Sequence, residues 1–155
     1  MRKITKEASE AFKAEINNDS ENYQPLPYDQ EKIVFSKDNT QVVIYWTKGT
    51  WEGRDKHTLL KLHGNTIAHN VQYLGSIDKA FNINLCGWGT PTTRERLNGL
   101  LETLGFDFRV KQQRGQQIAY GRWYGSNINR SYTLNEDGNQ NVFFINEYIT
   151  GRNVT

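Results

Sequence analysis

One stretch, residues 85–105, constrains the fold of this chain more than any other. Its sequence predicts the end of a buried strand, a glycine-bracketed turn around Trp88, and an amphipathic helix. Thr92 and Glu95 have the spacing of a capping box, which satisfies backbone N–H groups of the first helical turn. Four leucines fall on one face of the predicted helix: Leu97, Leu100, Leu101 and Leu104. Gly105 then suits the left-handed residue that ends such a helix.

The length and composition indicate one globular domain, residues 1–155. A single cysteine, Cys86, excludes an internal disulfide, so nothing in the composition favours an oxidising compartment. The first residues lack the apolar core of a signal peptide, and no apolar run is long enough to span a membrane. We therefore expect a cytosolic protein with no membrane partner.

Periodic and alternating apolar patterns predict an α+β fold, with two helices packed on a mostly antiparallel sheet. The first helix is expected over residues 5–16 and the second over 92–104. Strands are expected at 32–35, 41–47, 57–63, 66–71, 81–85, 106–111, 117–120, 131–134 and 142–149. Two hairpins are expected near the end, one around Arg114 and Gly115, and one that joins the last two strands through residues 135–139.

Residues 17–31 are polar, and Pro25 and Pro27 enforce extended backbone there. This segment is expected to be a long surface loop. Charge is also uneven along the chain, because residues 90–134 hold seven Lys or Arg and only three Asp or Glu. A basic section of this kind could meet nucleic acid, phosphate or an acidic protein surface, or it could be an ordinary solvated face.

Three histidines recur at intervals of six: His57, His63 and His69. One strand carrying all three would form a metal-binding face, but Gly64 and Asn65 are expected to turn the chain between them. No helical pair of histidines and no second cysteine completes a site. We expect neither a metal nor a cofactor.

Cys86 could act as a nucleophile with a histidine as its base, because such pairs are defined in space and not in sequence. Its position at the end of an apolar strand, beside Trp88, favours instead a small buried hydrophobic side chain. We expect no catalytic residues, and the chain carries no P-loop or dinucleotide-binding glycine motif.

The turn before the second helix has a physical argument for ligand binding. Gly87, Gly89 and the helix start could direct several backbone N–H groups at an anion, at the positive end of the helix dipole. The side chains that would join them are Trp88, Thr90, Thr92, Thr93, Arg94 and Arg96. Both arginines lie off the leucine face and are expected to face solvent. Alternatively, the threonines only cap the helix and the arginines pair with nearby glutamates.

A second candidate surface mixes basic residues with aromatic ones: Arg109, Lys111, Arg114, Arg122 and Arg130 with Tyr120, Trp123, Tyr124 and Tyr132. Such a mixture can follow a phosphate backbone and stack on bases. Strand alternation places Arg109 and Lys111 on one face, with Phe108 and Val110 on the other. The aromatic side chains could equally belong to the core.

Two segments carry a resemblance to known proteins: LHGNTIA at residues 62–68 and GWGTPTTRERLN at residues 87–98. They resemble a group of small tailed-bacteriophage proteins that share LHGN-x-IA and GW-x-T-x-TTRERLN segments. Shorter similarities fall at 3–12, 35–40 and 113–123, whereas the 17–31 loop, the 46–56 connection and the region after Tyr124 look like elaborations. The resemblance implies a phage product working in the infected bacterial cytoplasm, and it supplies no catalytic residues.

From this resemblance we expect a non-enzymatic phage binding protein that modulates host physiology or inhibits a host defence system. A host protein is the expected partner. Three alternatives remain open: a protein that sequesters a nucleotide or signalling molecule at the 87–96 turn, a nucleic-acid-binding protein, and a hydrolase that uses Cys86.

Overall fold

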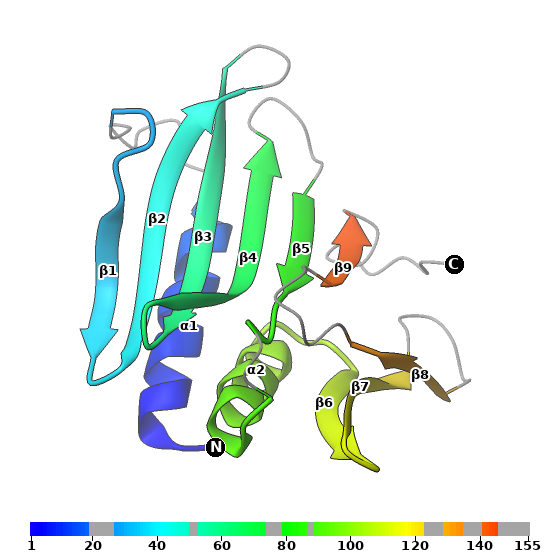
Figure 1. The fold of residues 1–155 in the computed structure, drawn as a ribbon. Helices are drawn as coiled ribbons and strands as arrows, with labels where there is room; N and C mark the ends of the chain where they lie inside the picture. Colours follow the sequence, from blue (N-terminus) through cyan, green and yellow to red (C-terminus); the bar gives the residue numbers. More distant parts are fainter. Residues whose placement is uncertain are drawn as a thin grey trace.

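A computed structural model describes residues 1–18, 27–49, 53–73, 79–86, 89–122, 129–134 and 141–145. These residues form two helices, α1 (Lys3–Asn17) and α2 (Pro91–Thr103) (Figure 1). The strands are β1 (Lys32–Lys37), β2 (Thr40–Lys48), β3 (Arg54–Leu62), β4 (Asn65–Tyr73), β5 (Lys79–Ile83), β6 (Phe108–Gln113), β7 (Gln116–Arg122), β8 (Asn129–Thr133) and β9 (Asn141–Ile145). Neither helix is long and apolar enough to cross a membrane.

The strands form two antiparallel sheets. The large sheet has the order β1-β2-β3-β4-β5-β9, and the small sheet has the order β6-β7-β8. Both helices lie against one face of the large sheet, and the small sheet lies beside α2 (Figure 1). The predicted α+β fold with two helices and mostly antiparallel strands is therefore confirmed, although the strands form two sheets and not one.

The expected hairpin around Arg114 and Gly115 is confirmed as β6–β7, with Gln113 opposite Gln116. The expected pairing of the last two strands is wrong. β8 pairs with β7, whereas β9 pairs with β5 at the edge of the large sheet. Strand patterning identifies a strand but not its partner, because hydrogen bonding along a strand edge carries no side-chain code.

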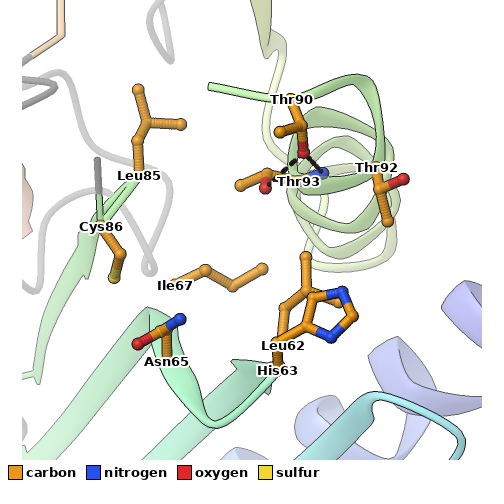
Figure 2. Close-up of a pocket in the computed structure, with 9 residues that line it drawn as sticks. All are labelled: Leu62, His63, Asn65, Ile67, Leu85, Cys86, Thr90, Thr92 and Thr93. Carbon is orange, nitrogen blue, oxygen red and sulfur yellow. Dashed lines mark hydrogen bonds between the residues drawn. The ribbon is translucent and has the colours of Figure 1, made fainter. Parts of the chain in front are cut away.

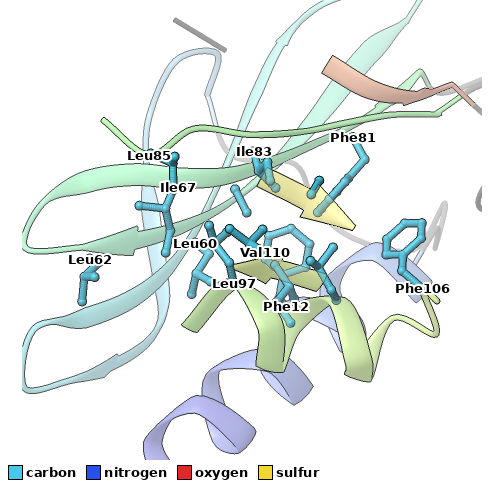
Figure 3. Close-up of a cluster of buried hydrophobic side chains, with 14 of the residues drawn as sticks. Phe12, Leu60, Leu62, Ile67, Phe81, Ile83, Leu85, Leu97, Phe106 and Val110 are labelled. Carbon is cyan, nitrogen blue, oxygen red and sulfur yellow. The ribbon is translucent and has the colours of Figure 1, made fainter. Parts of the chain in front are cut away.

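A single hydrophobic cluster joins both helices to both sheets. Figure 3 shows Phe12 and Leu97 from the helices meeting Leu60 and Ile83 from the large sheet. Phe108 and Val110 of β6 belong to the same cluster and are 1% and 2% exposed. The burial of these apolar side chains supplies the main stabilisation of the fold.

Helix α2 ends as its sequence predicts. Gly105 has a φ of +86°, the left-handed conformation that glycine adopts without a Cβ clash. Its N–H donates to the carbonyl of Glu102 at 3.0 Å, and the N–H of Phe106 donates to the carbonyl of Leu101 at 2.9 Å. These two bonds define a Schellman motif, and Phe106 is buried after it.

The predicted loop at 17–31 lies largely outside the described residues, which omit 19–26. Its first residue, Asn17, still belongs to α1. Residues 27–31 are all exposed, which agrees with a surface location for that end.

Helices α1 and α2 approach closely at Gly99. A Cβ added there would lie 2.2 Å from Cγ2 of Thr5. Thr5 is 1% exposed, and its hydroxyl bonds with Glu95 and Arg96, so its side chain is not free to rotate away. The contact between the helices therefore requires a residue without a side chain.

Gly99→Ala should lower the stability of the protein. Alanine favours a helix over glycine by about 0.5–1 kcal/mol, but overpacking a tight interior typically costs about 1–3 kcal/mol. We expect a net loss in the free energy of unfolding, measured by urea denaturation. Glu102→Ala, at an exposed position of the same helix, is the control and should be close to neutral; equal stability of the two variants would contradict the close approach.

Candidate functional site

The start of α2 is capped by Thr90 and not by Thr92. Thr90 Oγ1 accepts from the N–H of Thr93 at 3.2 Å and contacts the Thr93 hydroxyl at 3.0 Å. Pro91 occupies the first helical position, where its fixed φ fits and its missing N–H costs nothing. The predicted capping box of Thr92 with Glu95 is therefore wrong, because the proline places the cap two residues earlier.

Arg96 is buried, contrary to the prediction that it faces solvent. It is 2% exposed. Its Nε donates to Oγ1 of Thr40 at 3.0 Å, and its Nη1 donates to Oγ1 of Thr5 at 2.8 Å and to Oε1 of Glu95 at 3.1 Å. The Thr5 hydroxyl donates in turn to the Glu95 carboxylate. Arg96 thus joins α2 to α1 and β2, and it cannot also bind an external anion.

Arg94 is half-buried and bonded within the chain. Its Nη1 donates to the carbonyl of Gly89 at 2.7 Å and to Oε1 of Gln117 at 3.1 Å. A longer bond of 3.2 Å reaches Gln112. Arg94 therefore anchors the turn before α2 to the small sheet. Of the two cations in the predicted anion site, Arg96 is thus buried, and Arg94 is half-buried with its Nη1 bonded within the chain.

The cap also removes donors that an anion would need. Pro91 has no N–H, Thr93 donates to the Thr90 hydroxyl, and the N–H of Arg94 donates to the Thr90 carbonyl at 3.1 Å. Of residues 91–94, only Thr92 has no backbone or side-chain acceptor for its N–H among the described residues. Trp88 and Gly87 lie outside the described residues.

A pocket of about 370 Å³ lies beside this helix start; we name it the cap pocket. It is lined by Leu62, His63, Asn65, Ile67, Leu85, Cys86, Thr90, Thr92 and Thr93. Figure 2 shows the three threonines at the start of α2 on one side and Leu85 with Cys86 on the other, with Ile67 and Leu62 between them. Three of the predicted site residues, the threonines, are thus brought together.

The cap pocket has an apolar interior and a polar rim. Leu62, Ile67 and Leu85 are 5% exposed or less and belong to the core. His63 and Asn65 are exposed residues at the β3–β4 turn. The volume lies within the range of roughly 300–1,000 Å³ that small-molecule sites span. Such a pocket suits an uncharged apolar group with a hydrogen-bonding edge.

Cys86 lines the cap pocket. Its side chain was predicted to be buried, but it is only half-buried. Its thiol donates to the carbonyl of Thr66 at 3.0 Å, and burial raises the pKa of the thiol above its usual value of 9.0. A reactive cysteine needs a lowered pKa, because the thiolate is the nucleophile. The geometry gives no support to a nucleophilic role for Cys86.

The basic and aromatic residues of the small sheet are only partly brought together. Lys111 Nζ lies 4.2 Å from the centroid of Tyr120, which is 40% exposed. Arg109 is bonded to the carbonyls of Phe106 and Phe108, both at 2.6 Å. Arg114 and Arg122 are exposed. Trp123, Tyr124 and the side chains of Arg130 and Tyr132 lie outside what the structure describes, so a role of this surface in nucleic-acid binding stays a prediction.

Two of the three histidines meet on the face of the large sheet opposite the helices. Nδ1 of His57 and Nε2 of His69 are 2.8 Å apart, and Tyr45 stacks on His57 with ring centroids 4.4 Å apart. The turn at His63 and Gly64 brings the other two together, because each is six residues from His63. From the sequence, the turn was expected to keep the histidines apart, so the contact between His57 and His69 was not predicted. No group of three His, Cys, Asp or Glu able to hold a metal occurs in the described part of the chain.

The histidine pair makes stability depend on pH. Burial and then His69 lower the pKa of His57 from 6.5 to about 4, and burial also lowers the pKa of His69. The unfolded chain therefore takes up protons at these histidines at a higher pH than the folded chain does. The stability that depends on the neutral pair is complete above about pH 6.5 and is lost as pH falls from 6.5 toward 4.

His57→Gln should flatten the decline in urea midpoint between pH 7 and 5. His63→Gln, at an exposed position, should retain the wild-type decline, and an unchanged slope in His57→Gln would contradict the assignment.

Comparison with known proteins identifies the family. Residues 1–154 match the Kyanoviridae Gp96 protein family, and the chain belongs to it. This is a family of tailed-cyanophage proteins, so the phage origin expected from the sequence is confirmed. No curated protein and no solved structure matches the chain.

Proposed function

We propose that this member of the Kyanoviridae Gp96 family is a non-enzymatic binding protein that engages a host protein in the cytoplasm of the infected cell. The cap pocket receives one apolar side chain of that partner. The consequence of binding is the modulation of host physiology, of which the inhibition of a defence system is one form. The observation that carries the proposal is the combination of an apolar interior with a polar rim in the cap pocket.

The interior and the rim have separate roles in this proposal. Burying an apolar side chain against Leu62, Ile67 and Leu85 supplies binding free energy, about 25 cal/mol for each Å² of apolar surface removed from water. The hydroxyl of Thr92 and the amide of Asn65 offer hydrogen bonds to the backbone around the inserted side chain. Anchors of this kind, set in a desolvated pocket, carry most of the affinity of many protein interfaces.

The lining of the cap pocket supports binding over catalysis. The raised pKa of Cys86 keeps the thiol protonated, and Arg94 and Arg96 are bonded inside the chain. The described residues that line the pocket therefore include no activated nucleophile and no guanidinium that could stabilise a developing negative charge. A site of this composition recognises a shape and a few polar groups.

Thr92→Phe tests the proposal by filling the cap pocket without touching the cap itself, which Thr90 and Thr93 form. Tagged protein would be recovered from infected host cells and its partners quantified by mass spectrometry. We expect recovery of the specific host protein to fall at least tenfold, about 1.4 kcal/mol in affinity. Thr92→Ser keeps the hydroxyl and the space, and it should retain the partner at the same melting temperature.

Other outcomes identify the alternatives. A small molecule released on denaturation from the wild type, but not from Thr92→Phe, would indicate a sequestering protein. Recovery of nucleic acid that falls steeply with salt and is lost in Lys111→Glu would move the binding surface to the small sheet. A host partner retained equally by Thr92→Phe and the wild type would exclude the cap pocket from the interface.

A further inference from the structure

A second cavity lies under the other end of the helix pair. Its volume is about 140 Å³, and it is separate from the cap pocket in all of its lining residues. Ile16 of α1, Asn70 of β4 and Phe81 of β5 line its inner part, and Phe106 closes it after α2. Exposed Lys13 and Asn17 also line it, so the cavity reaches the surface beside α1. We name it the Asn70 cavity.

Asn70 is an unusual residue at this position. It lies in the middle of the large sheet, opposite Thr58 of β3 and Phe81 of β5, and it is 0% exposed. Neither its amide nitrogen nor its amide oxygen has a hydrogen-bond partner within the described part of the chain. Buried amides are almost always hydrogen-bonded, because desolvation without a bond is costly. The amide therefore offers its N–H donors and its oxygen acceptor to whatever enters the cavity.

The polar groups near Asn70 are only partly engaged, because Oγ1 of Thr58 and Oε1 of Gln72 are also buried without a hydrogen-bond partner among the described residues. Gln72 Nε2 donates to the carbonyl of Ile16 at 2.7 Å. Lys56 Nζ donates to the carbonyl of Glu15 at 2.7 Å and forms an ion pair with its carboxylate at 2.8 Å. These bonds hold the end of α1 on the sheet beside the cavity. They fix its shape, and of the three residues with unbonded buried side-chain atoms here, Thr58, Asn70 and Gln72, only Asn70 lines the cavity.

Aromatic walls and a cation complete the cavity. The rings of Phe81 and Phe106 have centroids 5.4 Å apart and are tilted by 33°. Phe81 is 1% and Phe106 is 6% exposed, so their faces are desolvated. Lys13 is exposed at the mouth and has no ion pair with any described residue. The cavity thus has an apolar interior that contains the amide of Asn70, and the positive charge of Lys13 lies at its mouth.

The size and chemistry of the cavity select a ligand class. An apolar cavity of about 150 Å³ holds a benzene ring, so a single six-membered ring fits inside, whereas a fused double ring would extend beyond it toward the surface. An Asn amide bonds to the edge of a base that presents a donor beside an acceptor. We propose that the Asn70 cavity binds a pyrimidine nucleotide, with the base edge on Asn70, the ring against the phenylalanines and the phosphate beside Lys13.

This inference does not rest on the cap pocket, and the two sites can be tested apart. Uridine monophosphate, uridine, cytidine monophosphate and adenosine monophosphate are titrated into the purified chain by calorimetry. We expect saturable binding of the uridine and cytidine nucleotides, at least tenfold tighter than that of the adenine nucleotide. Thr92→Phe should leave these affinities unchanged, because that residue does not line the Asn70 cavity.

Asn70→Leu removes the amide and keeps a similar volume. It should weaken pyrimidine binding at least tenfold while the melting temperature stays equal or rises, since an unbonded buried amide has been removed. Lys13→Gln should lower the affinity of uridine monophosphate to that of uridine. Lys6→Gln, another exposed lysine of α1 that lies outside the cavity, is the matched control and should change neither value.

Three results would overturn the proposal. The first is an absence of saturable pyrimidine binding at millimolar concentration, which means that Asn70 is satisfied by buried water alone. The second is equal affinity for the adenine nucleotide, which excludes the size argument. The third is unchanged pyrimidine binding in Asn70→Leu, which places the nucleotide at another site.

Discussion

The buried guanidinium of Arg96 is the constraint on which the arrangement of the helices depends. A charge removed from water is tolerated only where hydrogen bonds and an opposite charge replace its hydration. Here the replacements come from three elements at once: Thr5 of α1, Thr40 of β2 and Glu95 of α2. Hydrophobic packing brings the helices to the sheet without fixing their positions along it, because apolar contact is not directional. The bonds of Arg96 fix that register, and Gly99 provides the space for it.

The two hollows follow from the same arrangement. Thr90 and Pro91 begin α2 abruptly, and the helix start, the β3–β4 turn and the end of β5 enclose the cap pocket between them. At the other end of the helix pair, the polar contacts of Lys56 and Gln72 hold α1 on the sheet and leave Asn70 facing a cavity. Recognition is assigned to shape and hydroxyls in the cap pocket, and to one amide and the exposed Lys13 in the Asn70 cavity.

Local features of this fold could be predicted from the sequence, and partners in space could not. The leucine face of α2, the left-handed Gly105 and the β6–β7 hairpin each follow from a few neighbouring residues. Arg96 looked like a surface residue because helical periodicity identifies only the apolar face, and two of its partners, Thr5 and Thr40, lie more than fifty residues away. For the same reason, the sequence wrongly paired β8 with β9 and did not reveal the contact of His57 with His69. Asn70 gave no signal at all, since an isolated asparagine in a strand predicts nothing about burial.

A double-mutant cycle at Arg96 and Thr40 tests the central claim most directly. Arg96→Met and Thr40→Val each remove one side of the bond between α2 and β2 and keep much of the volume. The free energy of unfolding would be measured by urea denaturation for the wild type, both single variants and the double variant. The account predicts a coupling of about 1.5–3 kcal/mol, the usual strength of a hydrogen bond to a charged group. Additive effects, with coupling within about 0.5 kcal/mol of zero, would contradict the claim that Arg96 fixes the helices on the sheet.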